Sequence, residues 1–254
     1  MLFEEERKRQ IMLYVNEHQR ASVQELGEVF QVSESTVRRD LKELEESNLL
    51  KRTHGGAVSL QNVNFEPSVI EKEDQFREEK MEIARKACEM ISEGDTVLLD
   101  AGTTTLHLAR EMRSLSNVRV ITNSMIVLNE LKDYRGLELS MVGGLLRYET
   151  LAFVGPMAET ALEMVRVDKA FVATNGLDLE EGITTPNIIE AATKRKMFQI
   201  AKEVILLADH SKIGKVGYAK VADLSEIDHL IIDAGANDHF IDQLRKQGVS
   251  VTIA

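Results

Sequence analysis

The sequence predicts an α/β protein in which a small helical domain precedes a larger domain with a mostly parallel sheet. Apolar side chains recur at helical spacing up to about residue 46, and from Arg77 onward helical segments alternate with short apolar runs. Such alternation is typical of a parallel sheet with crossover helices. The length of 254 residues also allows two domains, since a domain commonly takes about 150 residues.

Composition excludes several classes of protein. The lone cysteine, Cys88, excludes an internal disulfide and a cysteine-rich metal site. The histidines at 18, 54, 107, 210, 229 and 239 lack the spacing of metal ligands, so we expect no metal and no cofactor. The longest apolar run, Val204–Ala208, is too short to cross a membrane. Because the acidic start, Met1–Glu6, is unlike a basic secretory signal, we expect a cytoplasmic protein.

Three short amphipathic helices are expected before residue 47. Ser22 and Ser33 are good N-caps for the second and third, and Glu25 completes a capping box with Ser22. Only two residues separate Phe30 from Ser33. Because the connection is so short, the two helices must cross steeply, as in a helix-turn-helix.

The third helix, Glu34–Glu46, carries a basic face opposite its predicted buried stripe of Val37, Leu41 and Leu44. The side chains on and beside that face are Ser35, Thr36, Arg38, Arg39 and Lys42. These residue types suit the phosphates and base edges of DNA. The net charge of −11 opposes DNA binding only as an average. The alternative is a solvated helix, because neighbouring acidic residues balance the cations.

Leu49–Val58 predicts two short strands around a glycine turn, which is the position of the wing in a winged helix. An ordinary closing hairpin is the alternative. The string VSESTVRRDLKELEESNLLKRTHGGA resembles the DNA-binding signature of the DeoR family of bacterial transcriptional regulators, over about residues 4–58. The resemblance implies a winged helix-turn-helix with the third helix in the major groove of operator DNA. It assigns DNA contacts to Ser33, Ser35, Thr36, Arg38 and Arg39, with Arg52 and His54 near the wing.

We expect a DNA-binding domain at residues 1–58, a linker at 59–76 and an α/β domain at 77–254. Polar residues, Pro67 and a charged run interrupt the pattern in the linker. Beyond it we expect helices near 78–92, 104–113, 124–132, 156–165, 188–202 and 237–247. The expected strands are Val97–Asp100, Val118–Thr122, Leu137–Val142, Lys169–Thr174, Val204–Ala208 and His229–Asp233. Sheets of this kind bind ligands beyond the carboxyl ends of their strands.

Polar clusters follow several of these strands. The first, Asp100-Ala101-Gly102-Thr103-Thr104-Thr105, opens a helix, whose N–H groups favour an anion such as a monophosphate. It lacks the Gly-Lys-Ser/Thr ending of a Walker loop, and a simple polar turn is the alternative. Further candidates are Thr122, Asn123 and Ser124, which could instead form only a cap, and Gly144, which could be part of a simple turn. Asn175 and the cation Lys212 also follow strands.

Glu190 and Lys194 are spaced to lie on one face of a helix. They are either a surface ion pair or a carboxylate for sugar hydroxyls beside an ammonium for a phosphate or anomeric oxygen. The sequence leaves the two interpretations open.

The segments LLDAGTTT, VITNS, MVGG, GITTPNIIEAATKRKM and LLADHSK resemble the effector-sensing domain of the same family, which is related in fold to ribose-5-phosphate isomerase. The resemblance places phosphate at Gly102–Thr105 and sugar beside Thr122–Ser124, with Glu190, Lys194 and Lys212 completing the pocket. Where the isomerase has an Asp-Gly-Ala-Asp run, this chain has Val172-Ala173-Thr174-Asn175, which cannot shuttle a proton. A binding pocket is therefore favoured over an enzyme.

The expected function is a repressor of a sugar-metabolism operon whose DNA affinity is modulated by a phosphorylated sugar. A hexose or fructose phosphate is the first choice. Because winged helices commonly bind paired half-sites, we expect a homo-oligomer, a dimer or tetramer. The alternative is a sugar-phosphate isomerase-like enzyme with a DNA-binding appendage. A nucleotide switch is disfavoured, since no nucleotide-binding fingerprint occurs.

Overall fold

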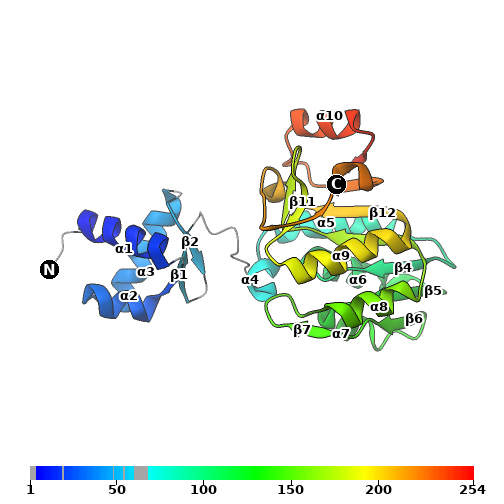
Figure 1. The fold of residues 1–254 in the computed structure, drawn as a ribbon, viewed down its shortest axis with the longest axis horizontal. Coiled ribbons are helices and arrows are strands. Elements are labelled where there is room, and N and C mark those ends of the chain that lie inside the picture. The colour runs from blue at the N-terminus through cyan, green and yellow to red at the C-terminus, as the bar shows by residue number, and fades with distance from the viewer. Residues whose placement is uncertain (1–3, 19, 48, 54, 60–67) are drawn as a thin grey trace. The chain divides into compact units, whose positions relative to one another are not determined.

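The computed structural model describes residues 4–18, 20–47, 49–53, 55–59 and 68–254. The chain divides into two compact units, Met1–Pro67 and Ser68–Ala254 (Figure 1). Each unit has its own hydrophobic core.

The first unit is a winged helix-turn-helix. Its elements are α1 (Glu4–His18), β1 (Arg20–Ser22), α2 (Val23–Phe30), α3 (Glu34–Glu46), β2 (Lys51–Thr53) and β3 (Gly56–Val58). The three strands pair antiparallel in the order β1-β3-β2. The predicted helices, the capping box of Ser22 with Glu25 and the cap at Ser33 are confirmed.

Strand β1 was not predicted, because Arg-Ala-Ser is too short to show alternation. It explains why β3 begins with a glycine. A Cβ on Gly56 would lie 2.0 Å from the carbonyl oxygen of Ala21 in β1, so only glycine allows these strands to approach so closely.

A buried ion pair joins α1 to α3. Arg7 Nε donates to Asp40 Oδ2 at 2.5 Å, and Arg7 Nη2 donates to Asp40 Oδ1 at 3.0 Å. Asp40 is wholly buried, so it does not belong to the solvated charges that balance the basic face. The pair instead fixes the orientation of α3 within its unit.

The second unit is built on a seven-stranded parallel sheet of order β15-β14-β12-β9-β4-β5-β6. Its strands are β4 (Thr96–Leu99), β5 (Val118–Thr122), β6 (Leu137–Met141), β9 (Val167–Ala173), β12 (Ala201–Ala208), β14 (His229–Ile232) and β15 (Ser250–Ile253). Smaller antiparallel sheets are formed by β7 (Leu145–Arg147) with β8 (Ala152–Val154), and by β10 (Gly176–Asp178), β11 (Gly182–Thr185) and β13 (Ala219–Ala222).

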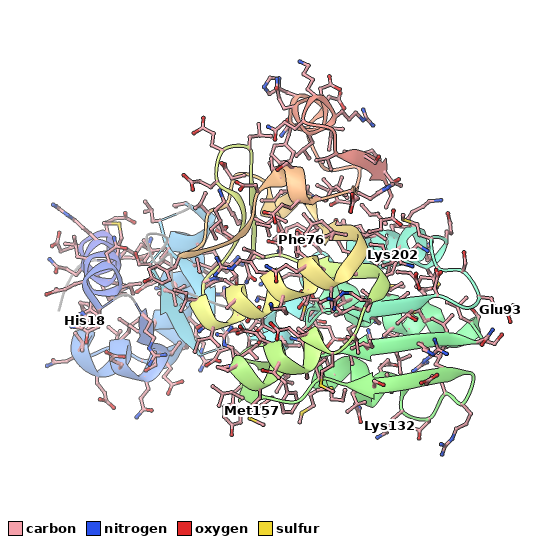
Figure 2. The ribbon with its side chains drawn as sticks, turned by 45° about the vertical axis from the view of Figure 1, so that its right-hand side comes forward. His18, Phe76, Glu93, Lys132, Met157 and Lys202 are labelled. Atoms are coloured by element: carbon pink, nitrogen blue, oxygen red, sulfur yellow. The ribbon has the colours of Figure 1, made fainter. Side chains whose placement is uncertain are left out.

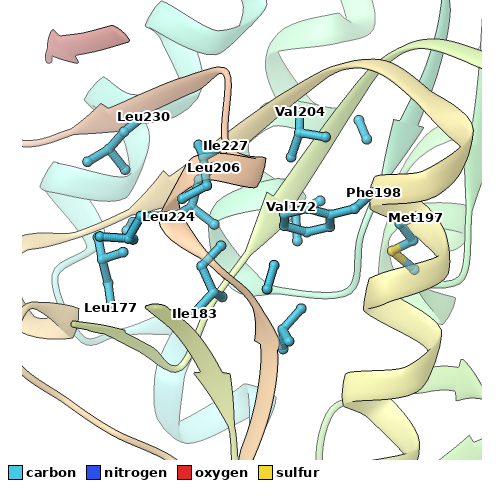
Figure 3. Close-up of a cluster of buried hydrophobic side chains, with 14 of the residues drawn as sticks. Val172, Leu177, Ile183, Met197, Phe198, Val204, Leu206, Leu224, Ile227 and Leu230 are labelled. Carbon is cyan, nitrogen blue, oxygen red and sulfur yellow. The ribbon is translucent and has the colours of Figure 1, made fainter. Parts of the chain in front are cut away.

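Helices cover both faces of the large sheet (Figure 1). They are α5 (Arg77–Cys88), α6 (Thr103–Glu111), α7 (Met125–Leu131), α8 (Pro156–Glu163), α9 (Ile188–Ile200) and α10 (Asp238–Lys246). The short helix α4 (Val69–Glu73) opens the unit and contacts α6. One core cluster packs α5, α6 and α7 on the sheet. The other packs α8, α9 and α10 on the opposite face, and Figure 3 shows part of it around Val172, Leu206 and Phe198.

Several element boundaries differ from the prediction. Helix α5 ends at Cys88, and β12 begins at Ala201 directly after α9, where helix was expected to 202. Strands β7, β8, β10, β11, β13 and β15 were not predicted; with three or four residues each they are too short to show a clear period. Helix α4 lies inside the stretch predicted as a linker, of which residues 60–67 fall outside the described residues.

The strand order reverses between β4 and β9. From β4 the chain continues to β5 and β6 on one side, whereas β9 is followed by β12, β14 and β15 on the other. Parallel sheets bind ligands beyond the carboxyl ends of their strands at such a reversal. Figure 2 shows Glu93 and Lys132, which precede β4 and β6, toward the right of the view, and Met157, at the start of α8, toward the left.

Candidate functional site

The basic face of α3 is exposed. Arg38, Arg39 and Lys42 have side chains that are 62%, 59% and 64% exposed, while the predicted stripe of Val37, Leu41 and Leu44 is buried. Each cation lies near a carboxylate; Arg38 Nη2, for example, is 2.8 Å from Glu34 Oε2. Exposed pairs of this kind are weak, so a phosphate can replace the carboxylate.

A hollow between α3 and the wing brings the predicted cations together. It is lined by Val23, Arg38, Arg39, Leu41, Lys42, Arg52, Thr53 and Gly56. Strand β2 is held against α3 because Arg52 N donates to Glu45 Oε1 at 2.9 Å. His54, the other wing candidate, lies outside the described residues.

The hydroxyl residues at the start of α3, which are Ser33, Ser35 and Thr36, form hydrogen bonds with one another. Ser33 Oγ accepts a hydrogen bond from Thr36 N at 3.3 Å. It also lies 2.8 Å from Ser35 Oγ and 2.9 Å from Thr36 Oγ1. Ser33 therefore caps the helix and orders its first turn, while Ser35 is exposed and Thr36 half-buried.

In the second unit, a buried ion pair lies at the reversal of strand order. Lys194 Nζ of α9 is bonded to Asp100 Oδ2 and donates to the Ala173 carbonyl at 3.0 Å. Asp100 Oδ2 also accepts from Ala173 N at 3.1 Å. The two side chains are 1% and 2% exposed. The pair thus joins the ends of β4 and β9 to α9.

The ion pair continues into a network of alternating charge. Glu190 Oε1 lies 3.7 Å from Lys194 Nζ, and Glu190 Oε2 accepts from Arg147 of β7. Glu190 and Lys194 are 3% and 2% exposed. The surface interpretation of this pair is therefore wrong, because tertiary packing covers that side of α9.

The amino end of α6 follows β4 directly. Gly102 is its N-cap, without a side-chain cap, and a Cβ there would lie 2.7 Å from Ala173 Cβ. Thr103 and Thr104 are buried, and neither hydroxyl makes a hydrogen bond within the described residues. Thr105 Oγ1 donates to Asp100 O at 2.6 Å and lies 2.9 Å from Gly102 O. The Thr105 hydroxyl thus stabilises the turn between β4 and α6, and its hydrogen is not available to the phosphate that was predicted to bind there.

The cluster after β5 is largely committed to the protein's own backbone. Thr122 Oγ1 donates to Leu99 O at 2.7 Å and accepts from Ser124 N at 3.0 Å. Ser124 Oγ caps α7 by accepting from Val127 N at 3.4 Å. Asn123 Nδ2 donates to Phe153 O at 3.2 Å. For Thr122 and Ser124 the capping alternative therefore describes the hydrogen bonds better than contact with a sugar.

Some buried polar atoms near this cluster lack hydrogen-bond partners among the described residues. They include Asp100 Oδ1, Asn123 Oδ1 and Thr150 Oγ1. Asp100 and Asn123 directly follow Leu99 and Thr122, which are paired in register on adjacent strands. Buried polar groups are nearly always hydrogen-bonded. These atoms are therefore suited to receive donors from a bound molecule.

The remaining candidates are spread around the same edge of the sheet. Gly144 has φ +148°, and a Cβ there would lie 2.7 Å from Val154 O. Asn175 Oδ1 accepts from Thr185 Oγ1 at 3.4 Å. Lys212 follows β12, two strands from β4, and its Nζ lies 3.2 Å from Asp209 Oδ2.

Sequence reasoning assigned no role to four residues that the structure largely buries in the second unit. Arg147 and Thr150 lie in an irregular hairpin that has no strong local signal. Burial, and then the charge of Lys212, lower the pKa of Lys80 to about 8. Burial, and then the Arg110 guanidinium, lower the pKa of His107 to about 4. Burial was the missing signal, and it depends on the tertiary structure.

The arrangement offers a helix amino end, unpartnered acceptors and a charge network with no net charge. It suits a small molecule with an anionic group and several hydroxyls. Within the described ranges there is no group of His, Cys, Asp and Glu that could hold a metal ion. No helix in the described part of the chain is long and apolar enough to span a bilayer.

Comparison with known proteins gives matches along most of the chain. Residues 75–234 match the model of the DeoR C terminal sensor domain, and residues 7–63 match that of the DeoR-like helix-turn-helix domain. The transcriptional regulator GlpR of Haloferax volcanii is 40% identical, over 97% of this chain and 96% of its own. The transcriptional repressor GlcR of Bacillus subtilis is 37% identical, over 99% and 97%.

The putative aga operon transcriptional repressor of Escherichia coli O157:H7 is 36% identical, over 98% of this chain and 93% of its own. Among solved structures, ribose 5-phosphate isomerase A of Methanocaldococcus jannaschii gives a TM-score of 0.42 at 17% identity and covers 55% of each chain. A likeness of that degree carries no functional argument.

Proposed function

Because this chain belongs to the DeoR family of transcriptional regulators, we propose that it represses a sugar-metabolism operon and that a phosphorylated sugar in the second unit modulates its DNA affinity. Two of the relatives described above are named as repressors, one of them of an operon. The proposed effector is a hexose or fructose phosphate, and the proposed DNA contacts are the exposed cations of α3 and the wing.

The unpartnered acceptors at the reversal of strand order carry the proposal for the effector. Asp100 Oδ1 and Asn123 Oδ1 are buried acceptors without donors among the residues described, and a sugar supplies donors through its hydroxyls. The amino end of α6 next to them suits a phosphate, since its N–H groups favour an anion. The effector residues proposed here are Asp100, Gly102–Thr104, Asn123, Asn175, Glu190, Lys194 and Lys212.

A binding role is favoured over isomerisation. The segment after β9 lacks carboxylates, and Thr174 Oγ1 is occupied by a hydrogen bond to Gly176 O at 2.8 Å. Glu190 is held by Arg147 and lies beside Lys194, which leaves it poorly placed to shuttle a proton. Incubation with aldose phosphates tests this directly, since an enzyme would release ketose phosphate.

Substitution of Thr104 tests the phosphate position. Thr104→Asp places a carboxylate beside the amino end of α6, where it should repel a phosphate by like charge. Calorimetric titration with fructose 1-phosphate, fructose 6-phosphate and glucose 6-phosphate should then detect no binding, while binding to a selected operator duplex persists. Thr104→Asn, which adds no charge, is the matched control and should retain affinity. Equal affinity in the Asp variant and the parent would remove the phosphate from this helix.

A further inference from the structure

Helix α4 is the first element of the second unit, and it contacts segments that carry the proposed effector site. It has five residues, with a capping box between Ser68 and Glu71. An isolated helix this short is not stable in water. Its helical state therefore depends on how it is held by the rest of the unit.

The amino end of α4 is bonded to the β7–β8 hairpin. Val69 N donates to the carbonyl oxygen of Glu149 at 2.8 Å, and the Val69 side chain is buried. Glu149 lies two residues after Arg147, whose guanidinium is bonded to Glu190 in the site. A rearrangement of the contact between Arg147 and Glu190 would therefore move the turn that accepts the hydrogen bond from Val69 of α4.

The carboxyl end of α4 is bonded to α6. Arg110 Nη2 donates to Glu73 Oε1 at 2.9 Å, and the two side chains are about one third exposed. Helix α6 begins at Thr103, beside the proposed phosphate position. A shift of α6 toward a bound phosphate would therefore change the contact between Arg110 and Glu73.

Lys80 of α5 closes the end of α4. It is 3% exposed, and its Nζ donates to the Gln75 carbonyl at 2.6 Å and to the Lys72 carbonyl. Burial, and then the nearby charge of Lys212, lower the pKa of Lys80. This contact is therefore sensitive to an anion bound near Lys212.

We propose that α4 transmits occupancy of the effector site to the DNA-binding unit, with Val69 and Glu73 as the positioning residues. The inference rests on the proposed function. Its physical basis is that α4 is bonded to two walls of the site, the hairpin and α6. Because the chain enters the second unit at Ser68, a change in the docking of α4 changes the position of that entry point.

A proline at Val69 removes the N–H that donates to Glu149 in the hairpin and is compatible with the helical conformation of α4. Val69 is the first residue of α4, a position that accepts proline, and Ser68 has the extended φ −61° and ψ 159° that proline requires before it. Val69→Ala is the matched control, because it trims the side chain but keeps the N–H. The measurement is the ratio of operator-duplex dissociation constants with and without saturating fructose 1-phosphate, fructose 6-phosphate or glucose 6-phosphate.

We expect Val69→Pro to reduce that ratio about three- to tenfold, the effect of one hydrogen bond that is kept in one effector state and broken in the other, and Val69→Ala to keep the parent's ratio. Glu73→Gln should reduce it as well, whereas Glu78→Gln, an exposed carboxylate in the first turn of α5, should not. If the proline variant fails to fold, the pair of glutamine variants decides.

Amide exchange gives a readout that does not depend on DNA. The probe that binds should change exchange at Val69–Glu73 and leave that of α10 unaltered. Equal ratios in the parent, Val69→Pro and Glu73→Gln would overturn the inference, and so would unchanged exchange at α4 when a probe is bound. If the parent's DNA affinity responds to none of the three sugar phosphates, the proposed function fails and the inference falls with it.

Discussion

Single residues at the proposed effector site are charged and almost completely buried. Burial of a charge is costly unless it is paired, and here each member of the network has an opposite charge beside it. The members of the network therefore offset one another's cost of burial, in addition to their proposed role in effector binding. Its members differ in this respect from the cations of α3, which are exposed.

Removal of one member of the buried ion pair should destabilise the second unit, because the remaining charge stays buried without a partner. Lys194→Met leaves Asp100 buried without its cation and should reduce the free energy of unfolding by about 3–5 kcal/mol. Adding Asp100→Asn to that variant should recover part of the loss, because no unpaired charge remains. Urea unfolding of the single and double variants measures the coupling. Equal losses in both would mean that the pair contributes no specific stability.

Substitution of the exposed arginines of α3 should affect DNA binding and not stability. Arg38→Ala and Arg39→Ala should leave stability unchanged, since both side chains are more than half exposed. Each should weaken operator binding, by about 1–3 kcal/mol if it contacts a base edge. Gel-shift titration measures the effect, with Arg9→Ala, an exposed arginine of α1, as the control. Parent-like binding by both variants would contradict the assignment of α3 as the recognition helix.

At the scale of elements, α6 joins several features of the second unit. Its amino end faces the proposed phosphate, its Arg110 holds α4, and its His107 is 3% exposed with Nε2 lacking a hydrogen-bond partner among the described atoms. The helix packs on α5 and the sheet through Leu108 and Ala109. Changes in this one helix therefore reach both the site and α4.

The stability contributed by His107 should depend on pH. Its pKa is lowered from 6.5 to about 4 in the folded chain, so between these values the unfolded chain binds more protons. This contribution is present above pH 6.5 and is lost as the pH falls toward 4. From pH 7 to pH 5 the loss should be about 2 kcal/mol.

Urea unfolding at the two pH values tests this contribution. His107→Leu should have a shallower pH dependence than the parent, whereas His239→Leu, at an exposed position on α10, should follow the parent. A parallel dependence in the parent and His107→Leu would contradict the burial argument.

At the scale of the whole molecule, DNA binding and effector binding are expected to be coupled between two units. Thermodynamic linkage requires that operator DNA change effector affinity by the same factor by which effector changes DNA affinity. Calorimetry of the effector with and without operator duplex therefore gives an independent value of the coupling.

Several large apolar side chains of the second unit are exposed, including Tyr148, Met157 and Met164. Those exposed side chains fit the expectation of a homo-oligomer. The fragment beginning at Ser68, which contains a complete core, should associate into at least a dimer, and so should the full chain. Sedimentation at micromolar concentration measures this. A strictly monomeric fragment would contradict an interface in the second unit, and association of the full chain alone would move the interface to the first.

The sequence by itself determined what depends on near neighbours in the chain. Helical spacing and caps predicted α2 and α3 with their exposed and buried sides, and apolar runs predicted most strands of the parallel sheet, because these signals extend over only a few residues. The order of polar clusters after strands also predicted the edge of the sheet where Asp100 and Lys194 meet.

Only the tertiary structure decided which of those side chains are buried together. Asp100 and Lys194 are 94 residues apart in sequence, and Arg147 and Glu190 are 43 apart. The first pairing depends on β4 lying beside β9 with α9 packed against them, and the second on the β7–β8 hairpin lying beside α9. No local pattern encodes either arrangement. The same is true of α4, which is too short to be helical without its contacts. Spacing along one helix could not distinguish a surface pair from a buried network, because burial is set by residues distant in sequence.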